Sequence, residues 1–129
     1  MSFIAELEID GQTLNVLECN YGFSQATDNL GKPSAMPRGG SISLILESSK
    51  DTDLVQWMVS PDQKKGGTIT FKRHDFNAPL RTVEFSDAIC VQFHESFNSS
   101  GASPMVTHIV ISAREMKIGS VSHVKNWGE

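Results

Sequence analysis

The sequence predicts a mainly β fold, an antiparallel barrel or sandwich with one short α-helix beside it. Three observations lead to this fold class. Apolar and polar side chains alternate with a period of two in several separate segments, as they do in half-buried strands. Polar turn residues separate these segments, which favours hairpin connections. A helical pattern occurs only once and does not alternate with the strand patterns, so a parallel α/β sheet is excluded.

Length and charge limit the classes of function. With 129 residues the chain fits one domain, residues 1–129. Its 11 basic and 15 acidic residues give a net charge of −4, which argues against nucleic acid as a partner. No apolar run approaches the roughly 18 residues of a membrane span, so no membrane insertion is expected. Residues 1–10 lack the basic and apolar regions of a secretory signal peptide, so we expect the chain to stay in the cytoplasm.

The first two strands are expected to form a hairpin. Residues 3–9 place Leu7 and Ile9 on one face, and Asp10-Gly11 then supplies the positive-φ residues of a tight turn. The second strand covers residues 13–25. Its apolar residues change phase after Val16, which predicts a β-bulge near that residue.

Four more strands are expected at residues 41–47, 68–74, 83–97 and 105–118. In the longest of them the large apolar residues all have odd numbers, which predicts one continuous apolar face. They are Val83, Phe85, Ile89, Val91, Phe93 and Phe97. Residues 61–67 are expected to form a turn, and residues 119–129 show no clear pattern.

One short helix is predicted between Ser49 and Ser60. Acidic and hydroxyl residues at 51–53 suit its first turn, and Pro61 lies just beyond its end. The apolar residues of this segment share one face, which we expect to pack on the strands. They are Leu54, Trp57 and Met58.

A long loop is predicted at residues 26–40, where glycine, proline and charged residues replace the apolar pattern. A loop of about fifteen residues is long for a compact domain, and such loops are more often functional or disordered than mere connectors.

The search for reaction chemistry finds no catalytic, cofactor or metal motif. The histidines His74, His94, His108 and His123 lie on different segments without the spacing of a metal site. Cys19 and Cys90 are expected to be reduced thiols. Cys90 and His94 share a face of the predicted strand but lie about 13 Å apart, too far for a nucleophile and its base. We therefore expect no enzyme activity.

Long collinear segments of the chain carry a resemblance to a known family. They are MSFIAELEIDG at the start, NVLECNYGFSQATDNLGKPSAMPRGGSISLILESSKDTDLVQWMVSP, VEFSDAICVQFHESF, and ISAREMKIG near the end. The chain resembles the haemolysin-coregulated proteins, the Hcp or TssD tube proteins of bacterial type VI secretion systems. The resemblance implies a small antiparallel β-barrel with one flanking helix. It further implies homohexameric rings that stack into the inner tube of a contractile machine, with sheath and spike proteins as partners, small effectors in the lumen, and export from the cell without a signal peptide.

The resemblance also implies which residues meet a neighbouring subunit. The long loop corresponds to the part of these proteins that contacts other subunits, and its candidate interface residues are Asp28, Asn29, Lys32, Pro33 and Arg38. The helix would lie on the outside of the ring. Two alternatives remain open. One is a tube protein of a phage-like tail, and the other is a monomeric ligand-binding β-barrel, although such barrels usually need about eight strands.

Overall fold

The computed structural model describes residues 3–23, 25, 27–33, 39–50, 52–73, 79–102 and 104–124. Within them the chain forms seven strands and one helix. In order these are β1 (Phe3–Ile9), β2 (Gln12–Tyr21), β3 (Ser41–Glu47), α1 (Asp53–Met58), β4 (Lys65–Arg73), β5 (Pro79–Phe97), β6 (Met105–Ile118) and β7 (Val121–Val124). The expected mainly β class with one short helix is confirmed.

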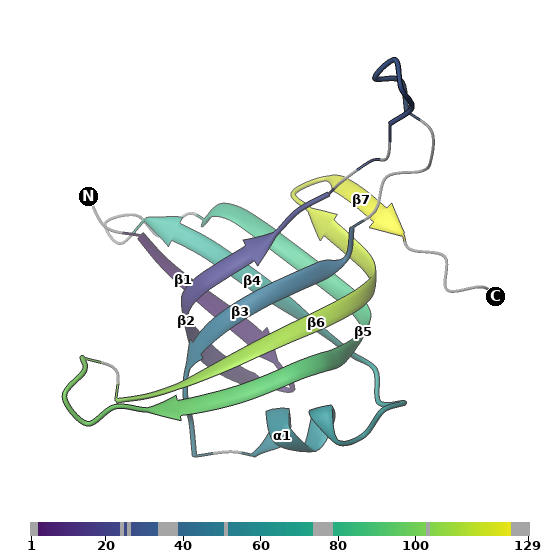
Figure 1. Ribbon diagram of the computed structural model, residues 1–129. Coiled ribbons are helices and arrows are strands. Elements are labelled where there is room, and N and C mark those ends of the chain that lie inside the picture. Colours follow the sequence, from purple (N-terminus) through teal and green to yellow (C-terminus); the bar gives the residue numbers. More distant parts are fainter. Residues whose placement is uncertain are drawn as a thin grey trace.

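Six strands close into an antiparallel barrel (Figure 1). They follow the order β3-β2-β1-β4-β5-β6, and β6 pairs back onto β3, which completes the ring. Strand β7 lies outside this ring, because β6 pairs with β3 through residues 106–112 and with β7 through residues 115–118. Strand β5 pairs with β4 only up to Ala88 and beyond that residue pairs with β6 alone, and the turn that joins β5 to β6 projects from the barrel. The structure is therefore a barrel and not a sandwich, because β3 and β6 pair with each other, whereas the sheets of a sandwich keep unpaired edge strands.

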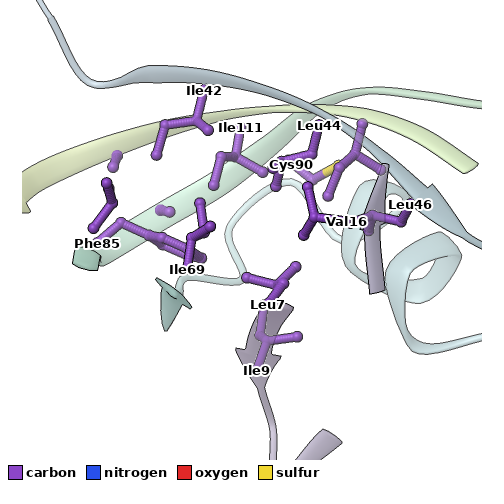
Figure 2. Close-up of a cluster of buried hydrophobic side chains, with 14 of the residues drawn as sticks. Leu7, Ile9, Val16, Ile42, Leu44, Leu46, Ile69, Phe85, Cys90 and Ile111 are labelled. Atoms are coloured by element: carbon purple, nitrogen blue, oxygen red, sulfur yellow. The ribbon is translucent and has the colours of Figure 1, made fainter. Parts of the chain in front are cut away.

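The barrel interior is a packed hydrophobic core (Figure 2). Side chains from all six strands meet there, and several have no accessible surface. The large aliphatic residues with no accessible surface are Leu7, Ile42, Leu44, Leu46, Ile69, Val83, Ile109 and Ile111. Burial of each such side chain stabilises the fold by about 1.5–3 kcal/mol relative to exposure. The interior is therefore filled by the protein's own side chains.

The hairpin and the bulge predicted near the start of the chain are both confirmed. Asp10 and Gly11 have φ angles of 53° and 76°, and the flanking Ile9 and Gln12 face each other across β1 and β2. This is the geometry that lets a two-residue turn match the twist of its strands. The register of β2 against β3 shifts between Val16 and Glu18, which is the expected bulge.

The continuous apolar face expected for residues 83–97 is wrong. Val83 and Phe85 point inward, but the next buried residues are Ala88 and Cys90, whereas Val91 is 41% exposed. A β-bulge causes this change of phase. Asp87 has a positive φ of 50°, and the register against β4 shifts between Phe85 and Ala88. A second register shift, against β6, follows between Cys90 and Gln92. Phe97 lies on the extension of the hairpin and is 69% exposed.

Three expected boundaries also differ from the structure. Helix α1 is shorter than residues 49–60, and Thr52 occupies its N-cap position without a side-chain hydrogen bond. Strand β4 begins at Lys65, inside the expected turn, because Lys65 already pairs with Ala88 of β5; further along the strand, Gly67 passes close to the Phe85 ring. Strand β7 forms within residues 119–129, where the sequence shows no clear pattern, and it pairs with the adjoining end of β6 across a turn at Gly119, which has a φ of 60°.

Candidate assembly surfaces

Helix α1 is attached to one end of the barrel through Trp57. The indole is 1% exposed, and its Nε1–H donates a hydrogen bond to the Gln63 carbonyl oxygen at 2.9 Å. Leu54 and Met58 are partly buried and pack against the core beside it. A helix this short has little intrinsic stability, so tertiary packing must hold it in place.

Polar contacts fasten the same helix to the β1–β2 hairpin. Lys65 pairs with Asp10 in the hairpin turn, and its ammonium nitrogen lies 5.7 Å from the centre of the Trp57 ring. Gln12 donates a hydrogen bond of 2.7 Å to the carboxylate of Asp53 in the first turn of α1. These contacts give the helix one orientation on the barrel end.

A cleft of about 170 Å³ lies where α1 faces the extended β5–β6 hairpin. Its walls are partly apolar and partly charged. The lining residues are Leu14, Glu47, Ser49, Lys50, Thr52, Leu54, Val55, Phe93, Glu95, Met105 and Thr107. Two exposed neighbours, Val55 at 36% and Met105 at 43%, extend the apolar wall to the surface.

Both carboxylates of this cleft are held by uncharged donors. Thr107, itself 3% exposed, donates to Glu95 at 2.9 Å and contacts the Ser48 hydroxyl at 2.7 Å. The Asn15 side chain donates to Glu47 at 2.6 Å. Neither glutamate forms an ion pair with a described residue, because the ion pairs found there are Lys65 with Asp10 and Lys72 with Glu6. The cleft therefore presents oriented negative charge beside apolar surface.

Residues 27–33 of the long loop form a compact turn built on Asp28. The Asp28 carboxylate accepts backbone N–H bonds from Leu30 at 2.9 Å and Lys32 at 3.0 Å. The Asp28 N–H donates to the Lys32 carbonyl at 2.8 Å, and Gly31 adopts a φ of 82°. Such bonds mimic a backbone turn and fix its shape. Leu30 stands at the tip and is 82% exposed.

The two ends of this loop meet near β7. The Phe23 ring packs edge-on to the His123 ring, with 5.1 Å between centroids, just after the end of β2. On the return side the ring covers Gly39 so closely that a Cβ there would lie 2.2 Å from it. The Gly40 carbonyl accepts a 2.7 Å bond from the Ala113 N–H in β6. The two ends of the loop are therefore held next to each other, through contacts with β7 and β6.

The structure places the predicted loop residues Asp28, Asn29, Lys32 and Pro33 on the compact turn, while Arg38 lies outside the described residues. The predicted helix residues Leu54, Trp57 and Met58 lie at the other end of the barrel (Figure 1). Sequence reasoning missed Leu30, although a single large apolar residue in a polar loop was a usable signal. Sequence reasoning also did not predict that Glu47 and Glu95 line the same cleft, because no local pattern connects these two residues.

The reactive side chains of the described residues are not gathered into a reaction centre. No group of three or more His, Cys, Asp or Glu there has the geometry to hold a metal ion. Burial raises the pKa of the Cys19 thiol to about 11 and also raises the pKa of Cys90, which makes both poor nucleophiles. The shift in β5 turns Cys90 inward and leaves His94 exposed, so the expectation that they share a face is wrong. The described helix, α1, is too short to cross a membrane.

A closed barrel with a filled interior, a projecting turn at residues 27–33 and a carboxylate-lined cleft place the chain in the class of small antiparallel β-barrel proteins. Comparison with known proteins then identifies the family. A model of the family described as hemolysin coregulated protein Hcp (TssD) matches residues 1–128. The chain belongs to this family, the tube proteins of type VI secretion systems, which are contractile injection systems. No protein with curated annotation matches the sequence.

Solved structures with the same fold include Hcp1 from Flavobacterium johnsoniae. That structure has a TM-score of 0.89 and 32% identity over 95% of this chain and 99% of that one. Hcp1 from Salmonella typhimurium has a TM-score of 0.74 and 16% identity over 92% and 86% of the two chains. A chain of an extracellular contractile injection system, the PVC sheath–tube complex in its extended state, has a TM-score of 0.56 and 20% identity over 91% and 88%. The last two comparisons concern the fold alone.

Proposed function

We propose that this chain is a structural subunit that forms homohexameric rings, and that these rings stack into the inner tube of a type VI secretion system. The observation that carries the proposal is family membership over residues 1–128, together with 32% identity to an Hcp1 protein along nearly the full length of both chains. The role needs no catalysis. It needs a rigid subunit with surfaces for its neighbours, and the packed barrel and its attached helix suit that requirement.

The remaining parts of the proposal concern partners and location. Sheath and spike proteins surround and tip the tube, small effectors travel in its lumen, and the subunit leaves the cytoplasm through the machine itself. The loop residues Asp28, Asn29, Lys32, Pro33 and Arg38 contribute to contacts between subunits. The projecting turn supports this assignment, because an exposed Leu30 beside polar residues is typical of a surface covered by a partner.

The alternative of a monomeric ligand-binding barrel is less well supported. A six-stranded barrel is narrow, and ligand-holding barrels usually have about eight strands. Here aliphatic side chains such as Leu7, Leu44 and Ile111 fill the interior (Figure 2).

The native mass of the purified protein tests the proposal. Size-exclusion chromatography with light scattering at two concentrations should give a persistent species near six times the chain mass. A monomer at both concentrations would contradict ring formation. Arg38→Glu should lower the assembled fraction without changing the circular dichroism spectrum, whereas the matched reversal Arg81→Glu, on the exposed start of β5, should leave assembly unchanged.

A further inference from the structure

The projecting turn and the carboxylate-lined cleft lie at opposite ends of the barrel. Figure 1 shows the turn at residues 27–33, in dark blue, extending from one end, and α1, which forms a wall of the cleft, at the other. The two features therefore cannot meet within one chain. Two copies in the same orientation, one above the other, would bring the turn of one copy to the cleft of the next.

The turn is a preformed insertion element. Its backbone is held by the bonds around Asp28, and Thr27 and Pro33 form a bridge that closes its base. Little conformational entropy remains to be lost when such an element binds. It exposes the Leu30 side chain at 82%, and the Lys32 ammonium forms no ion pair with a described residue. The turn thus offers one apolar and one cationic group, two residues apart.

The cleft has the complementary chemistry. Leu54, Val55 and Met105 supply apolar wall, while Glu47 and Glu95 supply two carboxylates against the single ammonium of Lys50. Thr107 and Asn15 already orient these carboxylates, each through one oxygen, which leaves the other oxygen available to a cation. The cleft volume of about 170 Å³ suits one or two side chains rather than a helix or a strand.

We propose that the cleft receives the turn of a second copy of this chain, with Leu30 on the apolar wall and the Lys32 ammonium beside Glu95 and Glu47. Because donor and acceptor surfaces differ, the contact is heterologous, and it repeats along an axis without closing. This inference rests on the proposed tube function. It adds the surface that accepts the loop, which separates contacts between rings from contacts within a ring.

Charge reversal on either side tests the pairing. Lys32→Glu and Glu95→Lys should each lower the fraction of protein in stacked polymers, because the equilibrium constant for stacking should fall at least about tenfold, which corresponds to about 1.4 kcal/mol over the whole ring–ring contact. Sedimentation measures that fraction, and light scattering measures the mass of the unstacked species. The double variant Lys32→Glu/Glu95→Lys should recover stacking, because the pair is restored with opposite sign. Glu84→Lys, an equal charge change at an exposed position of β5 outside the cleft, is the matched control and should stack normally.

Two milder variants separate loss of the contact from misfolding. Glu95→Gln keeps an acceptor for the buried Thr107 hydroxyl and removes only the charge, so it should weaken stacking while leaving the melting temperature unchanged. Leu30→Ala removes exposed apolar surface and should weaken stacking in the same way.

Each outcome bears on the proposal. Recovery of stacking in the double variant supports it. Normal stacking of Lys32→Glu and Leu30→Ala overturns it, as does loss of stacking in both reversals without recovery in the double variant. If wild-type rings stack and the variants behave like wild type, only this inference fails. A wild-type chain that remains monomeric at all concentrations overturns the tube function as well.

Discussion

Replacement of Trp57 by alanine should be among the most damaging single changes in this protein. The indole is 1% exposed, donates a hydrogen bond to the Gln63 carbonyl, and carries the Lys65 ammonium 5.7 Å from its ring centre. Truncation of a buried tryptophan to alanine destabilises a domain by about 3–5 kcal/mol, mainly through the cavity that it leaves. Because Trp57 is the only fully buried residue of α1, its loss should also release the helix from the barrel.

Trp57→Phe separates the two parts of this effect. Phenylalanine keeps most of the buried ring but lacks the N–H donor, and Gln63 is an exposed residue, so we expect water to replace the lost bond to its carbonyl. We therefore expect a loss of only about 1 kcal/mol for this variant. The difference between the two variants, roughly 2–4 kcal/mol, measures packing.

Urea unfolding followed by far-ultraviolet circular dichroism is the suitable assay, since Trp57 cannot serve as a fluorescent probe in these variants. With a slope of about 2 kcal/mol/M, a 4 kcal/mol loss lowers the midpoint by about 2 M. Protein concentration must be equal throughout, because assembly stabilises the folded subunit. If the free energies of unfolding of Trp57→Ala and Trp57→Phe differ by less than about 1 kcal/mol, the indole does not hold the helix and the reasoning is wrong.

Three further predictions concern backbone and thiol sites. A Cβ at Gly67 would lie 2.7 Å from the Phe85 ring and 2.8 Å from the Glu8 carbonyl oxygen. Gly67→Ala should therefore destabilise the protein by about 1–3 kcal/mol. An unchanged thermal midpoint would contradict this prediction and show that the neighbouring strands shift to make room for the methyl group. Asp87 has a positive φ of 50°, so Asp87→Gly should stabilise by up to about 1 kcal/mol and Asp87→Val should destabilise; equal midpoints for these two variants would contradict a strained bulge. Burial raises the Cys19 pKa from 9.0 to about 11, so the folded state holds this proton more tightly than the unfolded state. That contribution to stability is complete below pH 9 and is lost as the pH rises toward 11. Urea unfolding should therefore show a smaller decline over this range in Cys19→Ala than in wild type, and equal declines would refute the assignment.

Local chemistry was enough to predict most of the strands and the first hairpin. The alternation of residues 3–9 follows from the period of a strand, and Asp10-Gly11 adopts the positive φ angles that its residue types favour. The bulge near Val16 was visible because apolar residues on both sides of it mark the inner face. The helix face at Leu54, Trp57 and Met58 was visible for the same reason.

The pattern of β5 could not be read correctly in the same way. Its odd-numbered apolar residues include Val91 and Phe97, which are exposed, while Ala88 and Cys90 are buried on even numbers. A small residue such as Ala88 carries little signal, and a bulge at Asp87 reverses the phase without any change in composition. Strand β7 was missed because a short edge strand depends on its partner β6 for every backbone bond it makes.

By itself the sequence determined the fold class, the family and the position of the loop, because periodicity, turn chemistry and long collinear segments are properties of neighbouring residues. Tertiary structure alone decided that β6 closes the barrel on β3, and that Glu47, Glu95 and α1 enclose one cleft at the end opposite the projecting turn. Those relations join residues far apart in the chain. They arise only when burial of the shared core brings the strands together, and no local pattern records that choice.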